Sequence, residues 1–178
     1  MAEVARGDAA ALRALYLRYE RPTFNLILRL AGNREMAQDM MQETFTRVWT
    51  RARTFRGDQG SFKGWLFTIA LNVTRSELSR KRYGVRHLAE DAVEALASDA
   101  DGPDVLLQRS EAGGRVAAAL AQLSPHLREV VVMKVYQQLK FREIADITKT
   151  PEGTLKARFH RAVAELRERL APARSGQP

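Results

Sequence analysis

The 178-residue chain contains no cysteine. Disulfide frameworks, thiolate nucleophiles and zinc sites with cysteine ligands are therefore excluded. Histidine is scarce as well, and His87, His126 and His160 are too far apart to form a recognised metal-ligand spacing. We therefore expect neither a metal nor another cofactor.

Long apolar runs are also missing. No stretch approaches the roughly 20 apolar residues that a membrane-spanning helix requires. The N-terminus lacks the basic segment and apolar stretch that mark a secretory signal. Apolar residues make up 45% and charged residues 28% of the chain, as in folded, water-soluble proteins. These features predict a cytoplasmic protein without membrane insertion.

What the chain does have is an excess of basic residues, with a net charge of +8. Basic and acidic side chains number 15 and 8 in residues 1–84, 2 and 7 in residues 85–111, and 12 and 6 in residues 112–178. Lys and Arg that neutralise phosphates gain affinity by releasing counterions. The pattern favours two basic modules that bind a polyanion, joined by an acidic connector.

Apolar residues recur three and four positions apart outside the connector, and no stretch shows sustained alternation. We therefore expect an all-α protein of two small helical domains joined by a flexible acidic linker. The predicted boundaries are a first module at residues 1–84, a linker at 85–111, a second module at 112–172 and a disordered tail at 173–178.

In the first module, an apolar stripe predicts an opening helix and consists of Leu12, Leu15, Tyr16 and Tyr19. Gly32 and Asn33 then predict a helix stop and a new N-cap. The following helix has an inward side of Ala37, Met40, Met41, Phe45 and Val48, and an outward side of Asp39, Gln42, Glu43 and Arg47. A polar, Gly-containing loop at residues 54–60 precedes a helix that Ser61 can cap.

The second module contains the most informative segment, residues 141–162. Ser124 and Pro125 start the helix before it, whose predicted buried side is Leu127, Val130, Val131 and Val135. Residues 141–162 then predict two helices with a tight connection, in which Thr150 caps the second helix and Pro151 begins it. An apolar stripe fixes the inward side of that second helix: Leu155, Phe159, Val163, Leu166 and Leu170.

The outward side of this second helix can reach DNA bases and phosphates, and it carries Glu152, Thr154, Lys156, Arg158, His160 and Arg161. Any amphipathic helix has a charged, solvated face, so this face alone does not indicate DNA binding. The paired helices with a small residue, Ala145, at their crossing favour a DNA-binding helix-turn-helix.

The segment resembles region 4 of bacterial sigma factors. The match consists of Glu143-Ile144-Ala145, Gly153-Thr154-Leu155-Lys156-Ala157-Arg158 and Arg161-Ala162, in order and spacing. This resemblance implies that the outward residues bind the minus-thirty-five promoter element. Two residues depart from the family pattern, because Thr148 replaces a usual leucine and Lys149 stands where glycine is common.

The first module extends the resemblance. Residues 37–49 are similar to the helix with which sigma factors dock on RNA polymerase. The resemblance implies that this helix binds the clamp helices of the largest polymerase subunit through Asp39, Gln42, Glu43 and Arg47. It also implies a contact with the flap of the second-largest subunit. Without the resemblance, a solvated face is the simpler interpretation, and the methionines are better interpreted as core.

Residues 65–72 resemble the sigma region that recognises and melts the minus-ten element. Strand opening requires aromatic and basic side chains that hold single-stranded DNA. The candidates are Phe55, Arg56, Phe62, Lys63, Asn72, Arg75, Arg80 and Arg82. Trp65 and Phe67 can instead be core residues, which we expect for Trp65. Ser76 stands where the family often has an acidic residue.

The combined resemblance is to the extracytoplasmic-function (ECF) sigma factors, which direct promoter-specific transcription initiation and are not enzymes. It implies core RNA polymerase, promoter DNA and an anti-sigma factor as partners. The acidic linker can thread a basic channel of the polymerase. The alternative is a helix-turn-helix regulator that acts without becoming a polymerase subunit. Such a regulator would bind specific duplex DNA unaided, whereas a sigma factor requires core enzyme.

Overall fold

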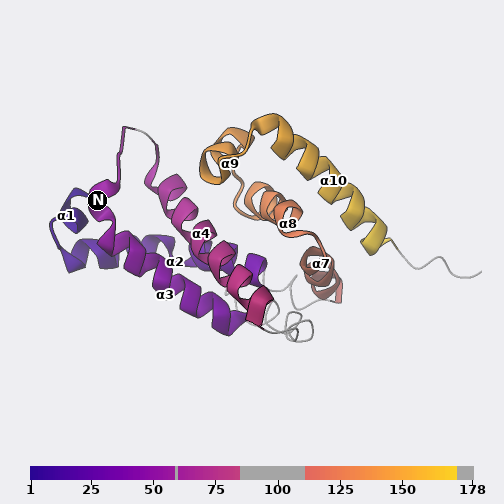
Figure 1. The fold of residues 1–178 in the computed structure, drawn as a ribbon, viewed down its shortest axis with the longest axis horizontal. Coiled ribbons are helices and arrows are strands. Elements are labelled where there is room, and N and C mark those ends of the chain that lie inside the picture. Colours follow the sequence, from indigo (N-terminus) through magenta and orange to yellow (C-terminus); the bar gives the residue numbers. More distant parts are fainter. Residues whose placement is uncertain (59, 85–110, 172–178) are drawn as a thin grey trace, which may run out of the picture.

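The computed structural model describes residues 1–58, 60–84 and 111–171, and every regular element in these ranges is helical (Figure 1). The predicted all-α class is thus confirmed for the described residues. Both the predicted linker (85–111) and the predicted tail (173–178) lie outside these ranges, except for Glu111, which begins a helix. No helix in the described ranges combines the length and the apolarity needed to cross a bilayer.

The first module is a bundle of three long helices with two short elements at one end (Figure 1). The long helices are α2 (Ala9–Ala31), α3 (Arg34–Thr50) and α4 (Phe62–Gly84), and the short ones are α1 (Ala2–Ala5) and the 3-10 turn η1 (Ala52–Thr54). Each long helix packs on the other two. Their shared core includes Leu26, Ile27, Val48, Leu66 and Phe67, each completely shielded from solvent.

Side-chain and backbone caps start and stop these helices as the sequence predicts. Gly32 has φ 71° and donates its N–H to Leu28 O at 2.8 Å, which ends α2. Asn33 Oδ1 accepts from Met36 N at 2.9 Å and starts α3, and Ser61 Oγ accepts from Gly64 N at 3.1 Å before α4. These caps fix where α2 ends and where α3 and α4 begin.

The second module contains α7 (Glu111–Ala121), α8 (Pro125–Val131), a π-helix η2 (Val132–Tyr136), α9 (Phe141–Thr148) and α10 (Glu152–Leu170). Pro125 begins α8, as predicted. The prediction that Val135 is buried is wrong, because this side chain is 52% exposed. The wider turn of the π-helix shifts the register, so Val132 and Met133 enter the core instead.

The two modules pack against each other. Helix α4 contacts α9, and α2 contacts η2 and α7. Buried residues of both modules form one continuous apolar cluster, which joins Leu30 and Leu71 of the first module to Val130 and Met133 of the second. The modules are also linked by polar contacts, of which the Arg75–Glu129 ion pair is the most extensive.

Candidate polymerase and nucleic-acid interfaces

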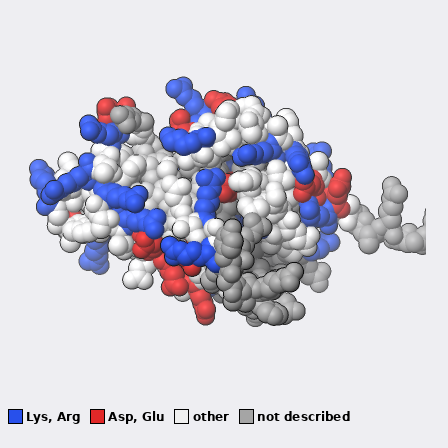
Figure 2. Space-filling view, in the orientation of Figure 1, with Lys and Arg blue, Asp and Glu red and all other residues white. Residues whose placement is uncertain are grey.

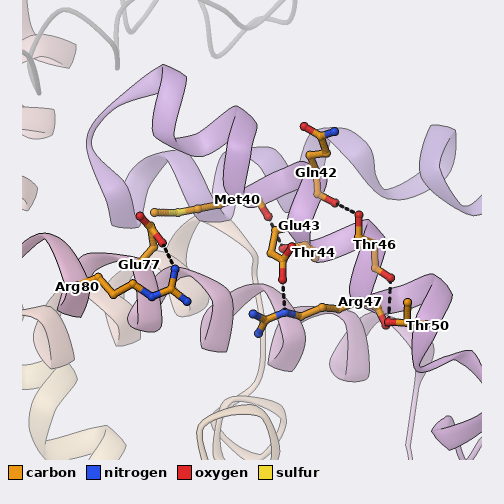
Figure 3. Close-up of polar contacts among 9 residues, drawn as sticks. All are labelled: Met40, Gln42, Glu43, Thr44, Thr46, Arg47, Thr50, Glu77 and Arg80. Atoms are coloured by element: carbon orange, nitrogen blue, oxygen red, sulfur yellow. Dashed lines mark hydrogen bonds and ion pairs between the residues drawn. The ribbon is translucent and has the colours of Figure 1, made fainter.

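The outward face of α3 carries the polar residues that the sequence predicts for polymerase binding. Asp39, Gln42 and Glu43 are exposed, and Arg47 is half-buried. Glu43 Oε1 accepts a 2.6 Å bond from Arg47 Nε, which fixes both side chains one helical turn apart (Figure 3). Figure 2 shows acidic atoms gathered over the part of the view that α3 occupies in Figure 1.

An apolar groove lies beside this face, between α2 and α3. It has a volume of about 840 Å³, and its apolar lining includes Tyr16, Phe24, Met41, Phe45 and Trp49. The rings of Tyr16 and Phe45 meet edge to face, with centroids 4.8 Å apart. Gln42, a predicted polymerase ligand, also lines the groove. A partner could therefore contact the polar face and the groove together.

Sequence reasoning missed the exposure of this groove. Tyr16 belongs to the apolar stripe that predicts the opening helix, but its side chain is 38% exposed, and that of Trp49 is 37% exposed. The sequence held a signal for the exposure of Trp49, because Trp49 follows Gln42 by seven positions, and this spacing places both side chains on one helix face. An exposed tryptophan beside polar residues is typical of a binding surface.

The predicted minus-ten aromatics form a cluster where the loop meets α4. Phe55 lies edge to face with Phe62 and Trp65, at centroid distances of 6.0 and 5.4 Å. Phe62 also meets Tyr19 of α2 at 5.0 Å, so all three loop-side rings are half-buried. The prediction that Trp65 packs on the core is confirmed, and Phe67 is completely buried.

The polar minus-ten candidates have different environments. Arg56 and Asn72 are exposed, whereas Lys63 is half-buried and donates to Gln137 O at 3.5 Å. Arg80 is exposed and pairs with Glu77 at 3.0 Å (Figure 3). Arg82 belongs to α4, but its side chain lies outside the described residues.

Arg75, another minus-ten candidate, faces the second module. Its Nε and Nη2 donate to the two carboxylate oxygens of Glu129 at 2.8 and 2.6 Å. Hydrogen bonding to Glu129 raises the pKa of Arg75, against the opposing effect of burial. Glu129 is only 8% exposed, so Arg75 supplies the charge that a buried carboxylate requires.

Helices α9 and α10 form the predicted helix-turn-helix. Leu155 and Ala162 are buried against the module, while the outward residues Glu152, Thr154, Lys156, His160 and Arg161 are exposed and Arg158 is half-buried. Leu170, at the end of the inward stripe, is 36% exposed. Arg161 also bonds Glu165 at 3.0 Å, and this bond, with a second from Arg169, lowers the pKa of Glu165.

The turn of this motif corrects one prediction and gives the conformation of both residues that depart from the family pattern. Thr150 does not cap α10: its hydroxyl donates to Thr148 O at 3.4 Å, and Pro151 occupies the N-cap position. Thr148 is buried, and its hydroxyl donates to Ile144 O at 2.8 Å within α9. Lys149 adopts the left-handed conformation, with φ 54° and ψ 38°.

Residues 15–84 match the sigma-70 region 2 family, and residues 114–166 match sigma-70 region 4. Over 176 residues, the chain is 30% identical to the RNA polymerase sigma-H factor of Pseudomonas aeruginosa, covering 95% of this chain and 91% of that protein. It is 32% identical over 165 residues to the ECF RNA polymerase sigma factor SigL of Mycobacterium tuberculosis, covering 92% and 90% of the two chains.

The chain belongs to the ECF sigma factors of RNA polymerase. The fold agrees with this assignment, because the structure of the sigma factor RpoE bound to the anti-sigma factor NepR from Bartonella quintana superposes with a TM-score of 0.69. The two chains are 23% identical, and the match covers 91% of this chain and 98% of RpoE. As an ECF sigma factor, the chain is a non-enzymatic subunit that directs transcription initiation with RNA polymerase.

Proposed function

We propose that the two modules of this ECF sigma factor divide the work of initiation between them. The first module docks on the core polymerase and holds the melted minus-ten element, and the second binds the duplex minus-thirty-five element. The observation that carries this division is the separation of two exposed polar faces, one on α3 and one on α10, in the segments that match regions 2 and 4.

Polymerase binding is assigned to the face of α3 and its neighbouring groove. Asp39, Gln42, Glu43 and Arg47 contact the clamp helices of the largest subunit, and the second module contacts the flap of the second-largest subunit. The Glu43–Arg47 bond supports this assignment because it orders two long side chains before binding. Trp49 and Tyr16 add apolar area that a coiled partner can bury.

Minus-ten binding is assigned to the aromatic cluster and to the basic side chains along α4. The Phe55 and Phe62 rings stack on unpaired bases, while Arg56, Lys63, Arg75, Arg80 and Arg82 neutralise phosphates and Asn72 offers an amide to a base. The exposed positions of Arg56, Asn72 and Arg80 support this assignment.

Minus-thirty-five binding is assigned to the N-terminal half of α10. Lys156 and Arg158 lie one and two turns from its start and reach base edges or phosphates in the major groove, together with Glu152, Thr154, His160 and Arg161. The exposure of this face, opposite the buried Leu155 and Ala162, supports the assignment.

We also infer that an anti-sigma factor holds the chain inactive in the cytoplasm, where the polymerase acts. The Bartonella quintana RpoE structure, which is a complex with an anti-sigma factor, supports this inference. The apolar groove on α2 and α3 is a surface that such a partner could cover in competition with the polymerase.

Co-purification with core polymerase, followed by run-off transcription from the DNA upstream of its own operon, tests the proposal. We expect a stable complex and a defined transcript, and weak binding of the same DNA by the chain alone. A chain that finds this DNA unaided and ignores the core enzyme would contradict the proposed division of work.

A further inference from the structure

The end of the first module that contains α1 and η1 is rich in arginine. Residues 1–13 and 51–58 contain five arginines, no lysine and three carboxylates. The arginines are all exposed, and they are Arg6, Arg13, Arg51, Arg53 and Arg56. Figure 2 shows Lys and Arg atoms over the end of the molecule at which Figure 1 labels α1. Only Arg56 belongs to the minus-ten candidates, and none of the five is assigned to polymerase binding.

Packing and a hydrogen bond join α1 to η1 and bring two of these arginines together. Val4 of α1 is 2% exposed and Ala52 of η1 is 4% exposed, and the two elements contact each other. Arg53 Nε donates to Ala5 O at 3.3 Å, and Arg6 directly follows Ala5 in the chain. Arg6 and Arg53, from segments that are distant in the sequence, therefore form one basic surface, the α1–η1 surface.

The carboxylates of the same segments leave these two guanidinium groups available. Asp8 is the N-cap of α2, and its Oδ1 accepts two backbone N–H groups of that helix at 2.8 and 3.1 Å. Glu3 and Asp58 are exposed, and in the described part of the chain neither of them forms an ion pair with the two arginines. The planar donor set of an available guanidinium suits the oxygens of a phosphate.

The α1–η1 surface continues the surface that is assigned to the melted minus-ten strand. Arg53 and Phe55 are two residues apart, and Phe55 lies edge to face with Phe62 at a centroid distance of 6.0 Å. The other basic candidates follow α4 to its C-terminal end, where Arg80 is exposed. The aromatic cluster thus links the basic side chains of α4 to those of η1 and α1.

We propose that Arg6 and Arg53 bind phosphates of the melted, non-template DNA strand downstream of the minus-ten element, without recognising its bases. The inference rests on the proposed assignment of the aromatic cluster to the melted strand. The chain leaves the C-terminal end of α4 toward the module assigned to the upstream element, so the strand runs from that end to the cluster and then to the α1–η1 surface. Contacts to phosphates hold and position a strand of any sequence.

Binding of holoenzyme to two pre-opened promoter templates at several salt concentrations tests this site. Both templates have an upstream duplex and a single-stranded minus-ten element, and only the longer one continues as a single strand beyond that element. The chain with Arg6→Gln and Arg53→Gln lacks two charges. On the longer template we expect the slope of log affinity against log salt to become shallower by about 1.4, since each phosphate contact to a single strand contributes about 0.7. The slope on the shorter template should not change.

The matched control is the chain with Arg6→Lys and Arg53→Lys, which keeps both charges at the same positions. It should retain the wild-type slope on both templates, because the release of counterions depends on charge. Far-ultraviolet circular dichroism establishes that every variant retains its helices. If the lysine and glutamine variants lose slope equally, the arginines act by docking α1 on η1, and the phosphate site is overturned.

Two further results would also overturn the site. An equal change of slope on both templates would assign the arginines to a contact with the polymerase or with the minus-ten element itself. Replacing the bases of the downstream extension with thymine should leave the affinity unchanged, and a loss as large as that of the glutamine variant would contradict a contact to the backbone alone.

A separate variant distinguishes failure of this site from failure of the proposed function. Phe55→Ala with Phe62→Ala should weaken the binding of both templates, because the aromatic cluster is assigned to the minus-ten bases. Unaltered binding by this variant would contradict that assignment. Weaker binding by this variant, together with wild-type slopes for the glutamine variant, would contradict the α1–η1 site alone.

Discussion

Arg128 of α8 donates through Nη1 to Leu30 O, the carbonyl near the C-terminal end of α2, at 3.0 Å. The same guanidinium donates through Nε to Leu120 O at 3.0 Å, and through Nη2 to Leu123 O at 3.2 Å and to Ala121 O. One side chain thus satisfies carbonyls at the C-terminal ends of two helices, one in each module. Burial lowers the pKa of Arg128, and the bonds to these carbonyls offset the loss of hydration that burial causes.

We predict that Arg128→Lys destabilises the folded chain by about 2 kcal/mol, because an ammonium group cannot reach carbonyls on two helices at once. Urea unfolding, followed by circular dichroism, measures this loss. Arg167→Lys, at an exposed position of α10, is the matched control and should change the free energy of unfolding by less than about 0.5 kcal/mol. Equal stability of the two variants would show that Arg128 is not a structural link.

Local signals predicted most of the helices and several of their ends. The Gly32-Asn33 pair was predicted to end one helix and start the next, and it does so through φ 71° at Gly32 and the Asn33 cap. Ser61 and Pro125 likewise act as predicted. Such signals succeed because caps depend on residues within four positions of each other, so tertiary context alters them little.

Side-chain environments that are set by residues far apart in the sequence could not be predicted from the sequence. Arg75 reads as an ordinary exposed cation, since its partner, Glu129, lies 54 residues away in the other module. The π-helix at Val132–Tyr136 breaks the 3.6-residue period on which the burial of Val135 was predicted. The outward faces of the two site helices were predicted from helical spacing, whereas the roles of their residues came from the resemblance and remain proposals.

Trp49 is the apolar residue whose removal should most weaken polymerase binding. We predict that Trp49→Ala lowers the affinity for core enzyme at least tenfold, because a half-exposed tryptophan beside Gln42 is suited to a central contact. Fluorescence anisotropy of a labelled chain titrated with core enzyme provides the measurement. Leu17→Ala is the control, because Leu17 is 60% exposed on α2 and does not line the groove. Similar losses from both variants would argue against the groove.

Lys156 and Arg158 should determine selectivity for the upstream element. We predict that Lys156→Ala with Arg158→Ala abolishes the preference for promoters with an intact minus-thirty-five element and leaves core binding unchanged. Each lost contact to a base costs about 1–3 kcal/mol, or roughly 5- to 150-fold. Competitive run-off transcription measures the ratio of transcript from templates with an intact minus-thirty-five element to transcript from templates with a scrambled one. Arg167→Ala, further along α10, should retain the preference. A parallel loss of core binding in the double variant would contradict the assignment of Lys156 and Arg158 to DNA binding.

Lys149 joins α9 to α10 in a conformation that favours glycine, with φ 54° and ψ 38°. A side chain with a Cβ atom costs about 1 kcal/mol there, so Lys149→Gly should stabilise the second module, although glycine's greater freedom in the unfolded chain offsets part of the gain. Thermal unfolding should therefore give an unchanged or higher midpoint. Arg167→Gly, within a regular helix, should instead destabilise by about 1 kcal/mol. If both glycine variants lose stability equally, then the turn does not hold Lys149 in the left-handed region in solution.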